Sequence, residues 1–412
     1  MTASDAKPPR HGRAALAFVA ITVGLDMVAQ SISFPILPRL TQELLGGDLP
    51  AAARWVGILE VGWAVPMFLA APVLGLLSDR FGRRPVIVLS VFGVGAELVM
   101  GALAPNVWWL LAARVLCGLT CGAQAAAMAY VADVTPPEGR TRAFGWLNAA
   151  LWSGIVVGPA LGGLLATHDL RAPFWAAAAF ALANGVYGLL VLPESLAKAD
   201  RARRLDWSKA SPLAAMDLLV RRPGLAILAA VLLLIWLAFQ AKDNMLVLYT
   251  AYRYGWTPLT FGLFATVLAL ASIGVQAGLA GRVARRIGEG RAVIVGLGLE
   301  VVGLVTMGLA STSVLFWASN LPIVLGGVAT PALQSMLSSR VGAEEQGRLQ
   351  GALGSIASLT SITAPLVFTQ MFAWSVGPGR GGGWSGATIL VGAALSFAAL
   401  VLVAVRGRPN LA

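Results

Sequence analysis

The chain has 412 residues, of which 58% are hydrophobic and only 12% are charged. Soluble globular proteins carry roughly 25% charged residues, so these charges are too few to cover a water-facing surface of this size. The formal net charge of +11 would fit a nucleic-acid ligand, but the positions of the charges give another explanation.

Twelve apolar segments are long enough to cross a membrane, which requires about 20 mostly apolar residues in a helix. In chain order they are 14–38, 54–77, 85–104, 107–132, 142–167, 172–193, 224–251, 258–281, 292–310, 313–338, 348–375 and 384–405. The sequence therefore predicts an all-α integral membrane protein of twelve transmembrane helices. Its predicted parts are an N-terminal six-helix bundle (1–193), a cytoplasmic basic linker (194–222) and a C-terminal six-helix bundle (223–412).

The basic residues give the chain an orientation. With both termini in the cytoplasm, 23 lysines and arginines fall in inner segments and five in outer segments. The remaining two, Arg114 and Lys242, lie inside spans. An excess of positive charge on the cytoplasmic side is the rule for membrane proteins. Topology thus explains the net charge, and we predict no nucleic-acid partner.

A repeated motif divides the chain into two halves. The sequence GLLSDRFG at 75–82 follows the second span, and GRVARRIG at 281–288 follows the eighth, 206 residues later. Parallel repeats with a binding site between them near the membrane midplane are a known plan of transporters. The repeat therefore predicts two pseudo-symmetric bundles.

Two motifs favour a protein whose helices turn tightly and pack closely. The loop 75–85 combines glycines, which allow a tight turn, with an aspartate and arginines at the anionic inner surface. The stretch 154–163 has small residues at a spacing that lets another helix approach, and a proline that bends the helix. The predicted gating residues are Gly75, Asp79, Arg80, Gly82, Arg83, Arg84, Gly154, Gly158, Pro159 and Gly162.

These motifs resemble signatures of the major facilitator superfamily, and within it those of the twelve-helix drug/proton antiporters. The loop 75–85 is similar to the signature between helices 2 and 3, and 154–163 to the antiporter signature of helix 5. Arg114 and Gly118 fit the helix-4 signature loosely. Nearly the whole chain is similar to bacterial tetracycline/proton antiporters. The resemblance implies a monomer in the bacterial inner membrane that moves protons and a small molecule without a cofactor or metal.

Seven ionisable side chains lie inside the spans. Each costs several kcal/mol at the bilayer centre, which makes each a functional hypothesis. A rise of about 1.5 Å per residue places three of them, Asp26, Glu97 and Glu300, about 14–20 Å from the inner ends of their helices. The full set is Asp26, Glu60, Glu97, Arg114, Lys242, Asp243 and Glu300.

The buried carboxylates are the predicted proton-coupling residues. Burial disfavours the charged form of a carboxylate, so such a group can take a proton from outside and release it inside. Acidic residues occupy the positions of Asp26, Glu97 and Glu300 in the tetracycline antiporters, so the resemblance implies the same role here, although two of them replace aspartates. Arg114 is included as a partner that neutralises a carboxylate. A structural ion pair or hydrogen bond is the alternative role for each.

The sequence departs from the tetracycline antiporters where a substrate would bind. Ser272 stands in place of their helix-8 histidine. Glu60, Lys242 and Asp243 are charged residues that those antiporters lack at these positions. Lys242 either meets an anionic group of the substrate or forms an internal pair with Glu60 or Asp243, and both alternatives stay open. The predicted substrate site is Glu60, Trp63, Gln240, Lys242, Asp243, Asn244, Gln276 and Gln334.

Two functions fit these residues. The first is proton-coupled export of a tetracycline-like drug or other toxic compound by alternating access. The second is dedicated export of an endogenous metabolite such as a siderophore or an antibiotic. The spans contain no histidine and no nucleophile–base pair, so we predict that the chain is not an enzyme.

The charge distribution predicts that residue 205 of the linker faces the cytoplasm. In a chain with Cys117 and Cys121 replaced by alanine, Leu205→Cys should react with a membrane-impermeant maleimide only after cells are permeabilised. Gly382→Cys, in the predicted outer loop, is the matched control and should react in intact cells. Strong labelling of Leu205→Cys in intact cells would contradict the topology.

Overall fold

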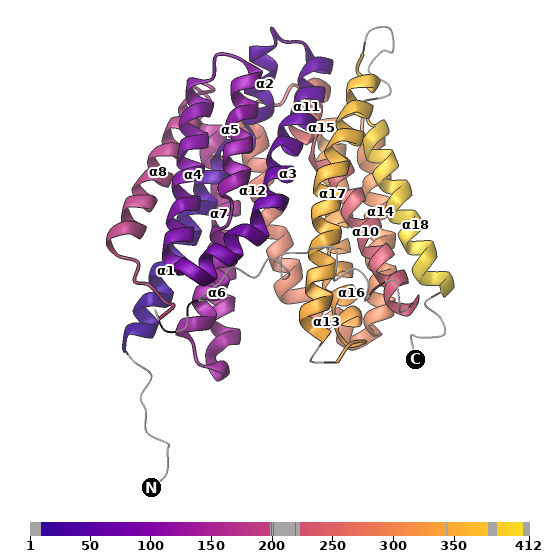
Figure 1. Ribbon diagram of the computed structural model, residues 1–412. Helices are drawn as coiled ribbons and strands as arrows, with labels where there is room; N and C mark the ends of the chain where they lie inside the picture. The colour runs from indigo at the N-terminus through magenta and orange to yellow at the C-terminus, as the bar shows by residue number, and fades with distance from the viewer. Residues whose placement is uncertain are drawn as a thin grey trace. The chain divides into compact units, whose positions relative to one another are not determined.

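The computed structural model describes residues 10–197, 199, 201, 219, 223–342, 345–377 and 385–406. Over these ranges the chain forms helices and no strand. Twelve segments in them are long and apolar enough to cross a membrane, which confirms the predicted spans (Figure 1). They are Ala14–Leu44, Leu49–Phe81, Arg83–Leu103, Val107–Val134, Arg142–Leu165, Ala172–Leu190, Gly224–Asp243, Pro258–Ile287, Glu289–Leu309, Ser313–Ser338, Gln346–Ser375 and Ala387–Val405.

Several spans are interrupted, which the sequence analysis did not predict. The break in the first span falls at Phe34–Ile36, where Pro35 supplies no backbone N–H for a continuous helix. The eighth span contains a π-helix at Val275–Ala280. The pieces are α1 (Arg10–Ser33) and α2 (Leu37–Leu44), α5 (Val107–Thr120) and α6 (Ala123–Val134), α12 (Pro258–Gly274), η5 (Val275–Ala280) and α13 (Gly281–Ile287), and α15 (Ser313–Gly326) and α16 (Ala329–Ser338).

The helices pack as two compact units, and the first draws on Met1–Ile36 and Val65–Ala210. Within it, α1 packs along α7 (Arg140–Leu165), and α4 (Arg83–Leu103) packs along α8 (Ala172–Leu190). Its hydrophobic core gathers buried side chains from α1, α4, α6 and α7. Asp26 lies on α1 and Glu97 on α4, two of the helices that contribute to this core.

Glycines on one face of α7 allow α1 to approach closely. A Cβ atom added at Gly154 would lie 2.6 Å from the Cβ of Met27, and one at Gly158 would overlap Ser31. The predicted close approach at 154–163 is therefore present, because no larger side chain fits there. The gating role of these residues stays a prediction.

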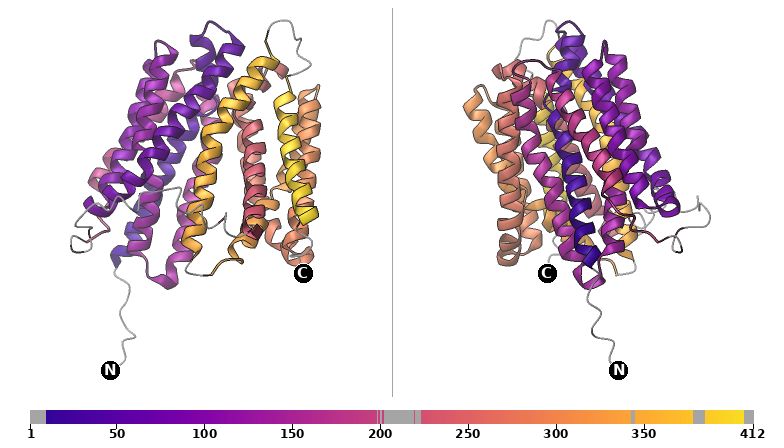
Figure 2. Two further views of the ribbon diagram at one scale, coloured as in Figure 1. Left: turned by 45° about the vertical axis from the view of Figure 1, so that its right-hand side comes forward. Right: turned by 90° about the vertical axis from the view of Figure 1, so that its left-hand side faces the viewer.

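The second unit draws on Leu37–Ala64 and Ser211–Ala412. In it, α10 (Pro223–Asp243) packs against α17 (Gln346–Ser375) and α18 (Ala387–Arg406), the red, orange and yellow ribbons of Figure 2. Its α14 (Glu289–Leu309) packs against α15 and α18. The helix α18 therefore lies between α10, which carries Lys242 and Asp243, and α14, which carries Glu300.

Residues 37–64, from the first two spans, pack within the second unit. Arg39 Nη2 donates to the backbone carbonyl of Trp256 at 2.7 Å, and a Cβ at Gly57 would overlap Thr369. The predicted division into bundles 1–193 and 223–412 is not decided by this packing and stays a prediction. Most of the predicted linker 194–222 lies outside the described residues.

The close approach of α1 and α7 generates a stability prediction. Gly158→Ala should destabilise the protein by about 1–3 kcal/mol, because the added methyl group forces the two helices apart. Gly145→Ala, on the same helix with no atom near its Cβ position, is the control and should not destabilise it. Thermal melting followed by tryptophan fluorescence in detergent measures both. Equal melting temperatures for the two variants would refute the packing argument.

Candidate functional site

The first unit contains a buried carboxylate with unused hydrogen-bonding capacity. Asp26 on α1 is only 4% exposed, and Gln30 Nε2 donates to its Oδ2 at 2.8 Å. Its Oδ1 is buried and has no hydrogen-bond partner among the described residues. A fixed negative charge in such surroundings is costly, so the site suits a carboxyl group that binds and loses a proton.

Glu97 lies near Asp26 and forms an ion pair with Arg114. Arg114 Nη1 lies 3.1 Å from Glu97 Oε1, and both side chains are mostly buried. The thiol of Cys117 lies near Glu97, and Glu97 is close enough to Asp26 for their charges to interact. The structure thus brings together three of the four predicted proton-coupling residues. Two carboxylates face one guanidinium, so the ionised cluster carries one net negative charge.

The fourth predicted residue, Glu300 on α14, belongs to a similar cluster in the second unit. Ser396 Oγ on α18 donates to Glu300 Oε1 at 3.2 Å. Lys242, at the end of α10, is close enough for its charge to act on Glu300. Lys242 Nζ also lies 3.4 Å from Asp243 Oδ1. Of the alternatives left open by the sequence, the internal pair of Lys242 with Asp243 is present.

A helix break lies directly after this cluster. The helix α10 ends at Asp243, and α11 (Leu246–Tyr254) begins three residues later. Asn244 occupies the break, and its Nδ2 is buried without a hydrogen-bond partner among the described residues. Interrupted helices at membrane depth occur inside protein or along a water-filled cavity, and transporters bind substrates and ions at them. The sequence analysis predicted a continuous span over 224–251 and missed this break. The run of polar residues at 242–244 is the sequence feature that could have indicated it.

The other predicted substrate residues lie on several helices of the second unit. Gln276 is exposed and lies in the π-helix η5, a kind of irregularity that is frequent at functional sites. Gln334 on α16 is exposed as well, whereas Gln240 is half-buried. Glu60 and Trp63, on α3 (Leu49–Phe81), are also half-buried. Polar side chains at membrane depth are costly against lipid, so these positions suit contact with water or a polar ligand.

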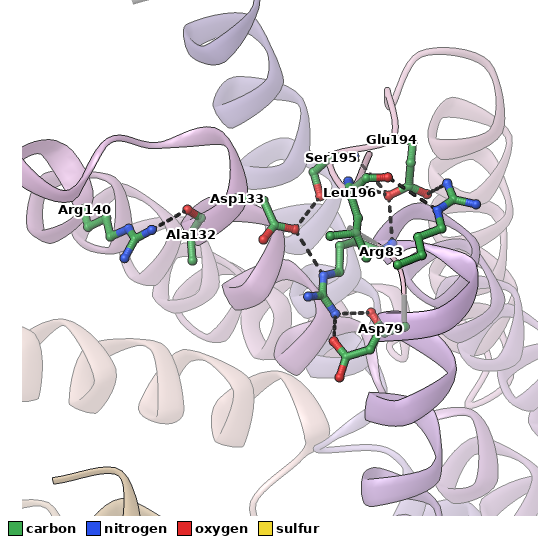
Figure 3. Close-up of polar contacts among 10 residues, drawn as sticks. Asp79, Arg83, Ala132, Asp133, Arg140, Glu194, Ser195 and Leu196 are labelled. Carbon is green, nitrogen blue, oxygen red and sulfur yellow. Dashed lines mark hydrogen bonds and ion pairs between the residues drawn. The ribbon is translucent and has the colours of Figure 1, made fainter. Parts of the chain in front are cut away.

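The predicted gating loop forms a network centred on Arg83 (Figure 3). The Arg83 guanidinium pairs with Asp79 in the same loop, and its Nε lies 3.1 Å from Asp133 Oδ2 at the end of α6. Ser195 Oγ donates to the same Asp133 oxygen at 2.9 Å. Arg83 is thus the basic partner of Asp79. Of the other residues predicted in this loop, Arg80 lies over the ring of Phe81, outside the network.

Glu194 caps the start of α4 from a distant part of the chain. Its Oε1 accepts from the backbone N–H groups of Arg83 at 2.8 Å and of Ser195 at 3.0 Å. A carboxylate at a helix N-terminus satisfies free N–H groups and favours the helix dipole. Gly82 has a φ of 109°, and a Cβ there would collide with Glu194. Sequence reasoning missed this cap, because no local pattern links residues 111 positions apart.

Twelve membrane-spanning segments, a buried ionisable cluster in each unit and interrupted helices together define a polytopic membrane transporter. The sequence profile of the Major Facilitator Superfamily matches residues 19–365, and the chain belongs to this superfamily. The predicted family resemblance and the predicted fold class are confirmed. The chain is a multi-pass protein of the inner membrane.

Two bacterial proteins are similar to this chain over nearly their whole length. Tetracycline resistance protein, class C, of Escherichia coli is 36% identical over 94% of this chain and 95% of its own length. Tetracycline resistance protein, class G, of Vibrio anguillarum is 33% identical over 95% of this chain and 97% of its own length. Among solved structures, the human organic anion transporter MFSD10 (TETRAN) superposes with a TM-score of 0.68 at 25% identity, covering 96% of this chain and all of that one.

The cap on α4 generates a prediction about local stability. Glu194→Ala should speed amide hydrogen exchange at Arg83 and Ser195 by about fivefold, because removal of a capping side chain costs about 1 kcal/mol. Hydrogen–deuterium exchange with mass spectrometry measures this rate. Glu138→Ala, which removes an exposed carboxylate outside the network, is the control. Unchanged exchange in Glu194→Ala would show that the cap does not stabilise α4.

Proposed function

We propose that this transporter exports a small organic compound in exchange for protons by alternating access, with a tetracycline-like drug as the first candidate substrate. The observation that carries the proposal is the pair of buried carboxylate clusters, built on Asp26 and Glu97 in one unit and on Glu300 in the other. The similarity to tetracycline resistance proteins over nearly the whole chain supports the direction and the substrate class.

The net charge of each cluster would change when it binds or releases a proton. An ionised cluster carries a net negative charge in a poorly hydrated site, and uptake of one proton from outside removes it. Loss of that proton to the cytoplasm restores the charge and prepares the next cycle. A difference of a few kcal/mol between protonated and deprotonated clusters is enough to shift the balance of outward- and inward-facing states.

The proposed substrate site lies near the break after α10. The buried Nδ2 of Asn244 lacks an acceptor among the described residues, so a ligand with a carbonyl, enolate or carboxylate oxygen would satisfy it. Gln240, Gln276 and Gln334 would supply further hydrogen bonds, with Trp63 as an apolar surface and Glu60 for a cationic group. The loop network around Arg83 and the glycines of α7 are proposed to gate the cycle.

A second candidate is the dedicated export of an endogenous metabolite such as a siderophore or an antibiotic. The observation that favours it is the set of departures from the tetracycline antiporters, namely Glu60, Lys242, Asp243 and Ser272. A thermal-shift screen of the purified protein against tetracyclines, other drugs and secondary metabolites separates the two candidate functions.

The chain is proposed to act as a monomer with both termini in the cytoplasm and with no cofactor.

Glu97→Gln and Glu300→Gln test the proton-coupling role, because glutamine keeps the shape of the side chain and cannot exchange a proton. In proteoliposomes, a pH gradient should drive tetracycline accumulation by the parent protein at least tenfold more than by either variant. Exchange of tetracycline across the membrane without a gradient should persist in both. Glu138→Gln is the matched control.

Two outcomes would contradict parts of this proposal. If both variants respond to the gradient as the parent does, the carboxylates are not the coupling residues. If the parent moves no tetracycline but binds and moves a metabolite from the thermal-shift screen, the second candidate replaces the first. The same variants are then tested with that compound.

A further inference from the structure

The turn between the eighth and ninth spans carries a surplus of positive charge. Residues 281–291, which form α13 and the start of α14, contain four arginines and one glutamate. The span that ends here, Pro258–Ile287, has 30 residues and is therefore about 45 Å long, the thickness of a bilayer with its headgroups. The next span begins at Glu289. The arginines thus lie at the depth of phospholipid headgroups.

Three of these arginines share one face of α13, which we call the arginine face. Arg282, Arg285 and Arg286 are three and four residues apart, so they are neighbours on the helix surface, and all three are exposed. Val283 and Ile287, on a different face, pack against the hydrophobic core of the second unit. Like charges at these spacings destabilise a helix, so an anion placed against the arginine face would stabilise it.

The protein itself supplies little negative charge to this face. Arg282 Nη1 donates to a backbone carbonyl of η5 at 2.8 Å. The guanidinium groups of Arg285 and Arg286 form no ion pair or hydrogen bond with any residue that the structure describes. Glu289, the one acidic residue of 281–291, accepts a hydrogen bond from the hydroxyl group of Ser335 on α16.

The matching loop of the first half obtains its negative charge from the chain. The two copies of the repeated motif are 206 residues apart, so Arg285 occupies the position of Asp79. In the first copy, Arg83 pairs with Asp79 and with Asp133 of α6. Because the second copy has an arginine where the first has this aspartate, it cannot form the same ion pair.

The space around the turn differs between the two copies in the same sense. Gly82 and Gly288 both have a positive φ, 109° and 84° respectively. A Cβ atom added at Gly82 would collide with the carboxylate of Glu194, whereas one added at Gly288 would meet no other described atom within 4 Å. The second loop therefore has the turn of the first without the acidic side chain that covers it.

We propose that the arginine face of α13, together with the exposed Arg291 at the start of α14, binds the phosphate groups of anionic phospholipids. The lipid supplies to this loop the negative charge that acidic side chains supply to the first loop. A guanidinium group binds a phosphate through two parallel hydrogen bonds, and arginines near an anionic headgroup are attracted to its charge. The inference is independent of the proposed function, since it involves neither the substrate nor the proton.

Native mass spectrometry of the purified full chain in detergent tests the proposal, with equal amounts of phosphatidylglycerol and phosphatidylcholine added. The parent should bind phosphatidylglycerol in preference. Arg285→Gln/Arg286→Gln should weaken this binding by about twentyfold, because each arginine near an anionic headgroup contributes about fivefold. Arg285→Lys/Arg286→Lys should retain most of the preference. Arg54→Gln/Arg348→Gln, which removes two exposed arginines from other helices, is the charge-matched control and should bind as the parent does.

Three results of this experiment would overturn the proposal. The first is equal binding of phosphatidylglycerol by the glutamine variant and the parent. The second is an equal loss in the control, which would show a general effect of net charge. The third is displacement of the lipid by an equal concentration of glycerol phosphate, which would show a site for a soluble phosphate.

Hydrogen–deuterium exchange in nanodiscs tests the same surface inside a bilayer. In the parent, exchange over 281–291 should be slower in phosphatidylglycerol than in phosphatidylcholine, and Arg285→Gln/Arg286→Gln should lose this difference. In phosphatidylcholine the variant should exchange no faster than the parent, because it lacks the repulsion between like charges, and this result also shows that it is folded. Exchange over 75–85, whose arginine has acidic partners, is the internal control. Equal exchange of the parent in the two lipids would contradict the proposal, since another part of the chain would then balance the arginines.

Discussion

A charge inside a membrane must be paired or neutralised, and the arrangement of this protein follows from that constraint. Of the seven ionisable residues identified in the spans, six lie in two clusters, each with more carboxylates than bases. Complete pairing would make the clusters permanently neutral. The surplus carboxylate leaves one charge that only a proton, or a rearrangement of the cluster, can remove.

The rest of the fold holds these clusters in place. Glycines at Gly154 and Gly158 bring α7 against α1, which carries Asp26, and α18 joins α10 to α14 through Ser396 and Glu300. Around Gly82, Arg83 on α4 connects α3 and α6 through ion pairs with Asp79 and Asp133.

The sequence predicted the spans because hydrophobic length is set by the bilayer and each span carries that signal in its own residues. It also predicted Asp26, Glu97 and Glu300, since a carboxylate within an apolar run is conspicuous. It did not predict that Glu194 caps α4, because this contact depends on tertiary packing between residues 111 positions apart. The π-helix at Gln276 and the break at Asn244 were missed because hydropathy does not report backbone hydrogen bonding.

The central claim is that protons and the exported compound move in opposite directions through this protein. Proteoliposomes loaded with tetracycline and an internal pH-sensitive dye, with the membrane potential clamped and no initial pH gradient, test it most directly. When they are diluted into drug-free buffer, efflux of the drug should draw protons inward and acidify the lumen. Drug efflux through the protein with no change in internal pH would contradict proton exchange.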